Sequence, residues 1–255
     1  MKDLMNGKKI LIVGIANDKS IAYGCAQKLR EQGAELAITY LNDKAERFVR
    51  PLAEELGAEI VMPLDVTVEG QMKSVFDACV EKWGKIDGVI HSLAFCPLDD
   101  LHAPLSGCSR TGFLQAMDVS CYSFIEMAKY AKDAMPDGGN LISFSYLGSA
   151  IATGDYNVMG CAKASLEAST RYLARDLGPQ GIMVNCISPG TIPTRAAGGI
   201  KDFDAMLEHS IEQACDGKLP TIDEVGNACL YFMSPLSEGV TGQVLYVDHG
   251  VSIVG

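Results

Sequence analysis

The residues with the clearest chemical potential lie in one short segment, from Tyr156 to Lys163. On a helix, a turn of 100° per residue would place Lys163 about 20° from Tyr156, with Met159 on the same side. One helix face would then carry a phenol, a thioether and an ammonium group. A phenol can donate a hydrogen bond to an oxygen on which negative charge develops during a reaction. A tyrosine and a lysine can occur seven residues apart on a helix surface by chance. Whether this pair indicates an active site therefore depends on where the fold places the helix.

Short apolar runs indicate the strands that must position this segment. Most are continuous rather than alternating, as expected for strands buried on both faces of a parallel sheet. The runs cover residues 10–13, 36–38, 60–62, 89–90, 141–144, 183–187 and 244–247. Between them lie amphipathic stretches of helical length, at residues 20–32, 43–56, 69–83, 110–132, 158–177 and 222–232. The alternation predicts an α/β fold, a single Rossmann-like doubly wound domain (residues 1–255) of about seven parallel strands flanked by helices.

The composition excludes several classes of partner. With 21 basic and 32 acidic side chains, the chain carries a formal net charge of -11. That charge repels phosphate backbones and anionic headgroups, so we expect neither nucleic acid nor membrane partners. The first nine residues lead into an apolar stretch too short for a signal peptide or a spanning helix, and we expect a soluble cytoplasmic protein. Nine cysteines without a CxxC pair and four histidines without ligand spacing predict reduced thiols and no metal site.

The first strand ends in a turn that begins at Gly14 and leads into a helix near Ser20. In a Rossmann-type fold this turn holds a pyrophosphate, because free backbone N–H groups and the positive helix end favour an anion. The strict GxGxxG fingerprint is absent, but Gly14 can form the tight turn and Gly24 can let the helix pack closely on the sheet. An ordinary glycine-containing turn is the alternative. Asp65 and the small residues at 92–94 follow the third and fourth strands, where they could contact adenine and ribose or serve as helix caps and turns.

Several motifs resemble those of a known family. They are SIAYG (20–24), YNVMG (156–160), AKASLEA (162–168) and TRAAGGIKDF (194–203), together with the series Tyr146, Tyr156 and Lys163. Over essentially its whole length, the chain resembles the bacterial NADH-type enoyl-acyl-carrier-protein reductases of the short-chain dehydrogenase/reductase superfamily. The resemblance is specific, because ordinary members of that superfamily place the lysine four residues after the tyrosine. Here that position is Gly160.

The resemblance implies an oxidoreductase of fatty acid biosynthesis, which transfers hydride from NADH to the β-carbon of a trans-2-enoyl thioester on acyl carrier protein. Tyr156 would donate a hydrogen bond to the enolate oxygen. Lys163 would bind the nicotinamide ribose and favour the phenolate form of the tyrosine. Tyr146 would be a second active-site tyrosine, and Met159 and Cys96 would lie near the acyl substrate.

The resemblance also implies which residues hold the cofactor: Gly14, Ser20, Ile21, Asp65, Val66, Leu93, Lys163, Ile192 and Thr194. A lid of about residues 188–215, made of a loop at 188–202 and a helix from Phe203, would close over the acyl chain and exclude water. The loop at 39–44, where the adenosine ribose would lie, contains no arginine for a 2′-phosphate and predicts a preference for NADH over NADPH. A homotetramer is implied as well, consistent with the near-absence of charge at 141–154 and 242–255.

Three places depart from the family pattern. After the lid helix, a segment with Asp216 and Gly217 replaces a basic stretch, which removes positive charge that could face an acidic carrier protein. The last strand usually ends in Asp-Gly-Gly, where this chain has His249 in the middle position. Thr191 and Pro193 alter a turn of the Gly-Pro-Ile type in the lid.

Two other functions are compatible with parts of the sequence. Ser143 lies 13 residues before Tyr156, the spacing of the carbonyl-polarising serine in 3-ketoacyl and other carbonyl reductases of the same superfamily. Those reductases place a lysine four residues after the tyrosine, and Gly160 occupies that position here, which argues against carbonyl reduction. A dinucleotide-binding sensor without turnover would explain the departures, but it would not explain why Tyr156 and Lys163 are both present.

Overall fold

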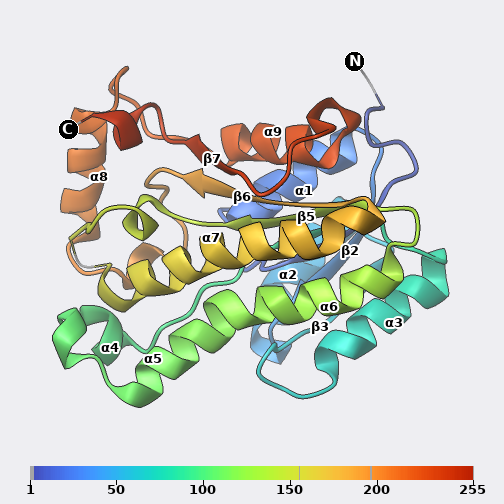
Figure 1. Ribbon diagram of the computed structural model, residues 1–255, viewed down its shortest axis with the longest axis horizontal. Helices are drawn as coiled ribbons and strands as arrows, with labels where there is room; N and C mark the ends of the chain where they lie inside the picture. The colour runs from blue at the N-terminus through green and yellow to red at the C-terminus, as the bar shows by residue number, and fades with distance from the viewer. Residues whose placement is uncertain (1–2, 155, 196, 255) are drawn as a thin grey trace.

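Seven parallel strands form one sheet in the computed structural model, which describes residues 3–154, 156–195 and 197–254 (Figure 1). The strands are β1 (Lys9–Val13), β2 (Glu35–Tyr40), β3 (Ile60–Pro63), β4 (Gly88–His91), β5 (Gly139–Phe144), β6 (Ile182–Pro189) and β7 (Val244–Val247). Their spatial order is β3-β2-β1-β4-β5-β6-β7, which confirms the predicted doubly wound sheet. The order reverses direction between β1 and β4, and in such sheets ligands bind at that point, outside the carboxyl ends of the strands.

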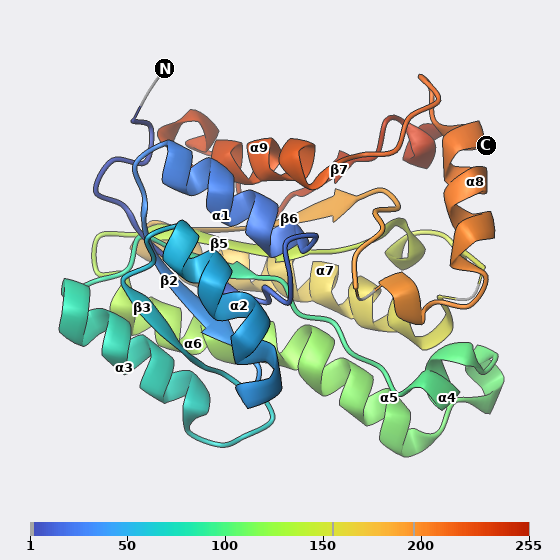
Figure 2. The ribbon, with the colours of Figure 1, turned by 180° about the vertical axis from the view of Figure 1, so that it is seen from behind.

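Helices cover both faces of the sheet (Figures 1 and 2). On one face lie α1 (Ile21–Glu31), α2 (Asp43–Glu55) and α9 (Ile222–Met233). On the other lie α3 (Gln71–Trp83), α6 (Ser123–Ala134) and α7 (Asn157–Leu177). At the start of α9, the Thr221 side chain accepts from the Glu224 N–H and the Glu224 carboxylate accepts from the Thr221 N–H, so α9 begins with a capping box.

The segment predicted as one helix at 110–132 is divided by a π-helical turn. α5 (Arg110–Met117) is followed by the turn at Asp118–Tyr122, and α6 continues from there. The extra residue per turn directs Ser120 and Ser123 toward β4: the Ser120 hydroxyl donates to the Phe95 carbonyl after β4, and Ser123 contacts His91. Turns of this kind recur at functional sites, because they redirect side chains without ending the helix.

Two short helical segments stand outside the layers, at the end of the molecule where α7 begins (Figure 1). α4 (Leu98–His102) follows β4, and α8 (Phe203–Gln213) follows the long loop after β6. That loop is shorter than expected, because β6 continues through Pro189, where it pairs with Val247. α8 begins at Phe203, as predicted for the lid helix.

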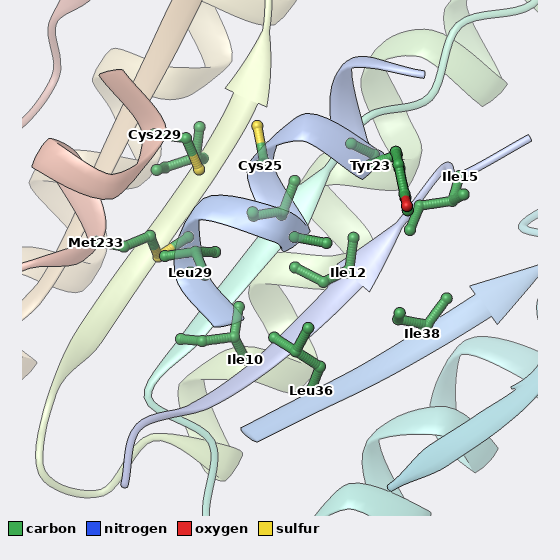
Figure 3. Packing of buried hydrophobic residues seen from close by; sticks show 14 of the residues in the cluster. Ile10, Ile12, Ile15, Tyr23, Cys25, Leu29, Leu36, Ile38, Cys229 and Met233 are labelled. Carbon is green, nitrogen blue, oxygen red and sulfur yellow. The ribbon is translucent and has the colours of Figure 1, made fainter. Parts of the chain in front are cut away.

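Buried aliphatic side chains from both sides of the central strands form the core. Figure 3 shows Ile10 and Ile12 of β1 packed with Leu29 of α1 and Met233 of α9. The intervening residue, Leu11, belongs to the cluster on the opposite face. Because side chains alternate along a strand, a strand with helices on both faces must be apolar at every position, which is why the predicted runs are continuous.

Gly24 has a different role from the one predicted. It lies in α1, where a Cβ atom would come within 2.4 Å of the Ile222 carbonyl oxygen on α9. Gly226 of α9 reciprocates, since its Cβ would lie 2.7 Å from the Gly24 carbonyl oxygen. The glycine therefore permits close packing of two helices, not packing of a helix on the sheet.

The described helices include none that is both long and apolar enough to cross a membrane. Nor do the residues at 3–154, 156–195 and 197–254 bring together three or more His, Cys, Asp or Glu side chains as metal ligands. All nine cysteines are free thiols. Cys25, Cys79, Cys121, Cys186 and Cys229 are buried, and burial raises the pKa of Cys79 to about 12, so these thiols serve as small core side chains.

Candidate active site

Two tyrosine rings meet at the carboxyl edge of the sheet. Tyr146 follows β5 and Tyr156 directly precedes α7; their ring centroids lie 4.7 Å apart with an interplanar angle of 55°. A Cβ on Gly148 would come within 2.5 Å of the Tyr156 ring, and a Cβ on Gly160 within 2.7 Å of the Gly148 carbonyl oxygen. The loop after β5 therefore packs on α7 only because both positions are glycine. A lysine at Gly160, as in ordinary superfamily members, would not fit this loop.

The predicted helix face is only partly correct. α7 begins at Asn157, whose φ of 38° lies in the left-handed region, so the regular 100° turn does not extend back to Tyr156. Asn157 is held there by its side-chain amide, which donates to the Leu101 carbonyl of α4 at 3.0 Å. Met159 and Lys163 lie one turn apart on α7, and both are buried.

Lys163 is a buried lysine whose ammonium group donates to a backbone carbonyl. Its Nζ donates to the Phe144 carbonyl oxygen at the end of β5, at 2.7 Å. Burial lowers the pKa of Lys163 to about 8, and nearby Cys186, Cys121 and Glu167 offset this only in part. The ammonium group has donor capacity beyond the Phe144 carbonyl, which suits hydroxyl groups of a ligand at this edge.

Tyr156 does not have the expected phenolate character. Burial raises its pKa above the ordinary value for tyrosine, and the nearby Tyr146 phenol adds to this. The Lys163 ammonium, which bonds to the Phe144 carbonyl, is not among the causes of the shift. Tyr156 is therefore a neutral hydrogen-bond donor at physiological pH.

His91 was not singled out by sequence reasoning, yet it lies near Lys163 at the carboxyl edge of the sheet. It is fully buried at the end of β4, with Nδ1 2.8 Å from the Ser143 hydroxyl and Nε2 2.7 Å from the Ser123 hydroxyl. Ser123 donates its proton to the Val119 carbonyl, so it accepts from Nε2–H, and Ser143 must donate to Nδ1. Burial, together with the Lys163 charge, lowers the pKa of His91 to about 3, so the ring is neutral.

This arrangement also decides the role of Ser143. Its side chain is 0% exposed and its proton is directed to His91. A serine that polarises a substrate carbonyl needs an exposed hydroxyl with a free proton. Ser143 has neither.

Glu167, a second residue without a clear sequence signal, holds the loop that carries Tyr146. One carboxylate oxygen, Oε1, accepts from the hydroxyls of Ser145 and Ser149, each at 2.5 Å. These serines flank Tyr146, and Glu167 lies one turn after Lys163 on α7. The carboxylate therefore fixes the tyrosine loop to the helix that carries the lysine.

The predicted cofactor residues gather along the same edge. Gly14 has a φ of 112°, and a Cβ there would lie 2.1 Å from the Ser92 carbonyl oxygen, so only glycine fits the turn after β1. The Ser20 hydroxyl accepts from the N–H groups of Ala16 and Asn17 and closes the turn. Ile21 begins α1, and its N–H group lies in the first turn, which has no acceptor within the helix. Such a helix start favours an anion.

The remaining predicted cofactor residues line the neighbouring loops. Asp65 Oδ1 accepts from the N–H and hydroxyl of Thr67, so one carboxylate oxygen is occupied by the local turn. Val66 and Leu93 are half-buried against the α3–α6 side of the core. Past β6, Ile192 is buried, and the Thr194 hydroxyl accepts from the Ala197 N–H.

The two predicted substrate residues share one apolar cluster. Met159 is buried with Leu101, Ala116, Val158 and Ala162, and Cys96 and Tyr156 pack against the same group. Burial raises the pKa of Cys96 to about 11, so its thiol is protonated and apolar in character. This cluster therefore forms an apolar surface next to Tyr156.

Two of the departures from the family pattern contact each other. His249 Nδ1 lies 3.0 Å from Asp216 Oδ2, and Nε2 lies 3.4 Å from Glu224 Oε1. His249 has a φ of 54°, a conformation that normally favours glycine. The contact joins the segment after α8 to the end of β7 and the start of α9. Asp216 is thus engaged by the protein itself, and its pKa is lowered through the His249 contact despite the opposing effect of desolvation.

Comparison with known proteins agrees with this geometry. A family model described as enoyl-(acyl carrier protein) reductase matches residues 14–252. The chain is 48% identical over 252 residues to the enoyl-acyl-carrier-protein reductase (NADH) 1 of Rhizobium meliloti, covering 99% of this chain and 93% of that one. It is 45% identical over 250 residues to the enoyl-acyl-carrier-protein reductase (NADH) FabI of Escherichia coli, covering 98% and 95%.

Solved structures of such reductases share the whole fold. The reductase of Anaplasma phagocytophilum, crystallised with NAD, has a TM-score of 0.96 at 42% identity, over 100% of this chain and 97% of that one. The Bacillus cereus reductase, crystallised with NADP+ and an indole naphthyridinone, has a TM-score of 0.97 at 42% identity, over 100% of both chains. By sequence over nearly its full length and by fold, this chain belongs to the enoyl-acyl-carrier-protein reductase family.

Proposed function

We propose that this chain reduces the carbon–carbon double bond of a trans-2-enoyl thioester on acyl carrier protein, with NADH, as a step of fatty acid biosynthesis. The observation that carries the proposal is the partly buried Tyr156, a neutral donor in ring contact with Tyr146, at the start of the helix that carries Gly160 and the buried Lys163. A hydrogen-bond donor in a water-poor pocket is what an enolate oxygen requires.

The residues present fit a dinucleotide. The start of α1 suits the pyrophosphate, with Gly14, Ser20 and Ile21 around it, and Asp65 Oδ2 stays open to an adenine amino group. The other contacts proposed are Val66, Leu93, Lys163, Ile192 and Thr194. When bound, NADH supplies the hydride that adds to the β-carbon of the substrate.

The chain's own groups would then act on the thioester. Tyr156 donates its hydrogen bond to the thioester oxygen as negative charge develops there, and its raised pKa keeps the proton available. Lys163 binds ribose hydroxyls while the Phe144 carbonyl holds its ammonium in place. Met159 and Cys96 shape the apolar wall for the acyl chain. The lid of about residues 188–215 excludes water, which strengthens the Tyr156 hydrogen bond.

Carbonyl reduction is the weaker alternative, because the buried Ser143 directs its proton to His91. The assembly proposed is a homotetramer, which the exposed apolar side chains of β7 and the C-terminal residues support. The expected cytoplasmic location stays a prediction.

The test is steady-state oxidation of NADH with crotonyl and longer enoyl thioesters, beside an acetoacetyl thioester. We expect turnover with the enoyl thioesters and little with the acetoacetyl thioester. Faster turnover of the acetoacetyl compound would assign a carbonyl reductase instead. NADH binding by calorimetry without oxidation of any of these compounds would assign a sensor.

A further inference from the structure

Three hydroxyl groups from separate segments meet between the sheet and α8. The Thr191 hydroxyl oxygen lies 2.7 Å from that of Ser210 on α8 and 3.4 Å from that of Tyr146. Thr191 and Ser210 are 5% and 6% exposed. The same three residues line a small cavity with Ser188, whose buried hydroxyl has no partner in the part of the chain that the structure describes.

Ser210 is the residue through which α8 contacts the interior of the protein; we call the position of α8 with this contact formed its seated state. It is the one residue within Phe203–Gln213 that is fully buried, and the apolar side chains of Phe203, Met206 and Leu207 on the same helix face are only partly buried. A helix with so little buried apolar surface opens at low cost, and the few contacts it makes determine its position. The short contact between Ser210 and Thr191 is therefore well placed to define the seated state of the lid helix.

On its other side, Thr191 leads to the proposed reaction centre. The Tyr146 hydroxyl contacts Thr191, and the Tyr146 ring packs on Tyr156. A buried hydroxyl that loses its hydrogen-bond partner carries a desolvation penalty. Movement of Ser210 therefore changes the preferred position of the Thr191 hydroxyl, and through it that of the Tyr146 hydroxyl. Thr191 replaces the proline of the family's Gly-Pro-Ile-type turn, and a proline would bring no hydroxyl.

We propose that Thr191 is a positioning residue, which couples the seating of α8 to the orientation of Tyr146 and, through the ring contact, of Tyr156. The inference rests on the proposed function, because the roles of the two tyrosines belong to it. When the Ser210 hydroxyl contacts the Thr191 hydroxyl, it holds that hydroxyl in the position where the Tyr146 hydroxyl also contacts it. Seating of the lid over an acyl chain and alignment of the tyrosine pair are then one event.

The test compares Thr191→Val, which removes the hydroxyl, with Thr191→Ser, which keeps it, and adds Ser210→Ala and the double variant Thr191→Val/Ser210→Ala. His209→Ala is the matched control, because it changes an exposed neighbour on the same helix. kcat and KM are measured with a long-chain enoyl thioester. We expect Thr191→Val to lower kcat about fivefold, the effect of one lost hydrogen bond, and to raise KM. Thr191→Ser and His209→Ala should resemble the wild type.

The double variant should be no worse than Thr191→Val alone, because one series of contacts is broken in either case. Unchanged kcat and KM in Thr191→Val, equal impairment in Thr191→Ser, or multiplied effects in the double variant would overturn the proposal. Amide hydrogen exchange of residues 203–213 gives a readout independent of activity, and Thr191→Val should accelerate it while Thr191→Ser does not. An inactive wild type would contradict the proposed function, and the exchange result would still decide whether Thr191 seats α8.

Discussion

Burial disfavours the charged forms of both Lys163 and Tyr156, and so it moves their pKa values in opposite directions. The pKa of Lys163 falls to about 8 and that of Tyr156 rises, which leaves a lysine that is mainly charged at neutral pH and a tyrosine that keeps its proton. The site therefore holds one cation and one neutral donor, without an ion pair between them. This division matches a reaction in which an oxyanion is stabilised by donation and not by proton loss from the tyrosine.

Tyr156→Phe and Lys163→Ala should each lower enoyl thioester turnover by on the order of a hundredfold or more, the effect of removing an oxyanion donor. The two variants should differ in NADH affinity. Lys163→Ala removes the proposed ribose contact and should weaken binding in calorimetry, whereas Tyr156→Phe should leave the Kd unchanged. Near-normal turnover in both variants would remove the assignment.

Lys163→Met should stabilise the protein at neutral pH. The pKa of this lysine drops from 10.5 to about 8 on folding, so the unfolded state binds more protons between those values and wild-type stability rises with pH across that window. Below pH 8 the buried charge costs on the order of 3 kcal/mol. Denaturant unfolding at pH 7, 9 and 10 should show the advantage of the Met variant shrinking as pH rises. A constant difference would place the lysine pKa outside this window.

Leu41→Arg should shift cofactor preference toward NADPH. Leu41 is 55% exposed after β2, while Asn42 caps α2 and accepts from the Lys44 N–H, so Lys44 belongs to the first turn of that helix. The wild type should prefer NADH by at least roughly tenfold in kcat/KM, about 1.4 kcal/mol, because no arginine meets a 2′-phosphate at the end of β2. Equal rates with both cofactors would indicate that Lys44, or Arg47 one turn on, reaches the phosphate.

At the scale of elements, glycine determines which surfaces approach. Gly24 and Gly226 bring α1 and α9 into backbone contact, and Lys28 adds an ion pair to Asp223 at 2.5 Å. Gly148 and Gly160 do the same for the Tyr146 loop and α7. In both places the absence of a Cβ atom sets the distance between elements.

Gly24→Ala should destabilise the protein by roughly 1–3 kcal/mol, because its Cβ would overlap the Ile222 carbonyl and force the helices apart. Gly178→Ala is the control: a Cβ there meets nothing within 4 Å, and its φ of -54° is ordinary for alanine. The control should be neutral or more stable by up to about 1 kcal/mol. Thermal unfolding monitored by circular dichroism compares them, and equal melting temperatures would refute the packing argument.

At the scale of the whole molecule, apolar side chains remain exposed along one edge of the sheet. β7 is an edge strand in which Leu245 is 37% and Tyr246 is 36% exposed, and Ile253 beyond it is 81% exposed. These residues lie in the nearly uncharged stretch at 242–255, in which Asp248 is the one acidic side chain, and of which Gly255 falls outside the described residues. Edge strands with apolar side chains are usually covered by a partner.

Light scattering at micromolar concentration should therefore give the mass of a homotetramer. Leu245→Glu should reduce that mass, because a charge buried in a subunit contact is costly. Val68→Glu changes an exposed apolar residue after β3, far along the sheet order from β7, and should leave the mass unchanged. A monomer mass for the wild type would contradict the predicted assembly.

The sequence by itself determined the order of strands and helices, the sheet edge and the family. Buried parallel strands and amphipathic helices each leave a regular pattern of apolar residues in the sequence. The family is recognised from a short spacing, because the lysine stands seven residues after Tyr156, at Lys163, and not four residues after it, at Gly160. Only the tertiary structure decided the contacts of His91 with Ser143 and Ser123, of Glu167 with the tyrosine loop, and of Asp216 with His249. These partners lie 18 to 52 residues apart, and a single hydrogen bond between distant residues leaves no periodic trace. The pKa values likewise follow from burial, which depends on every element packed around the group.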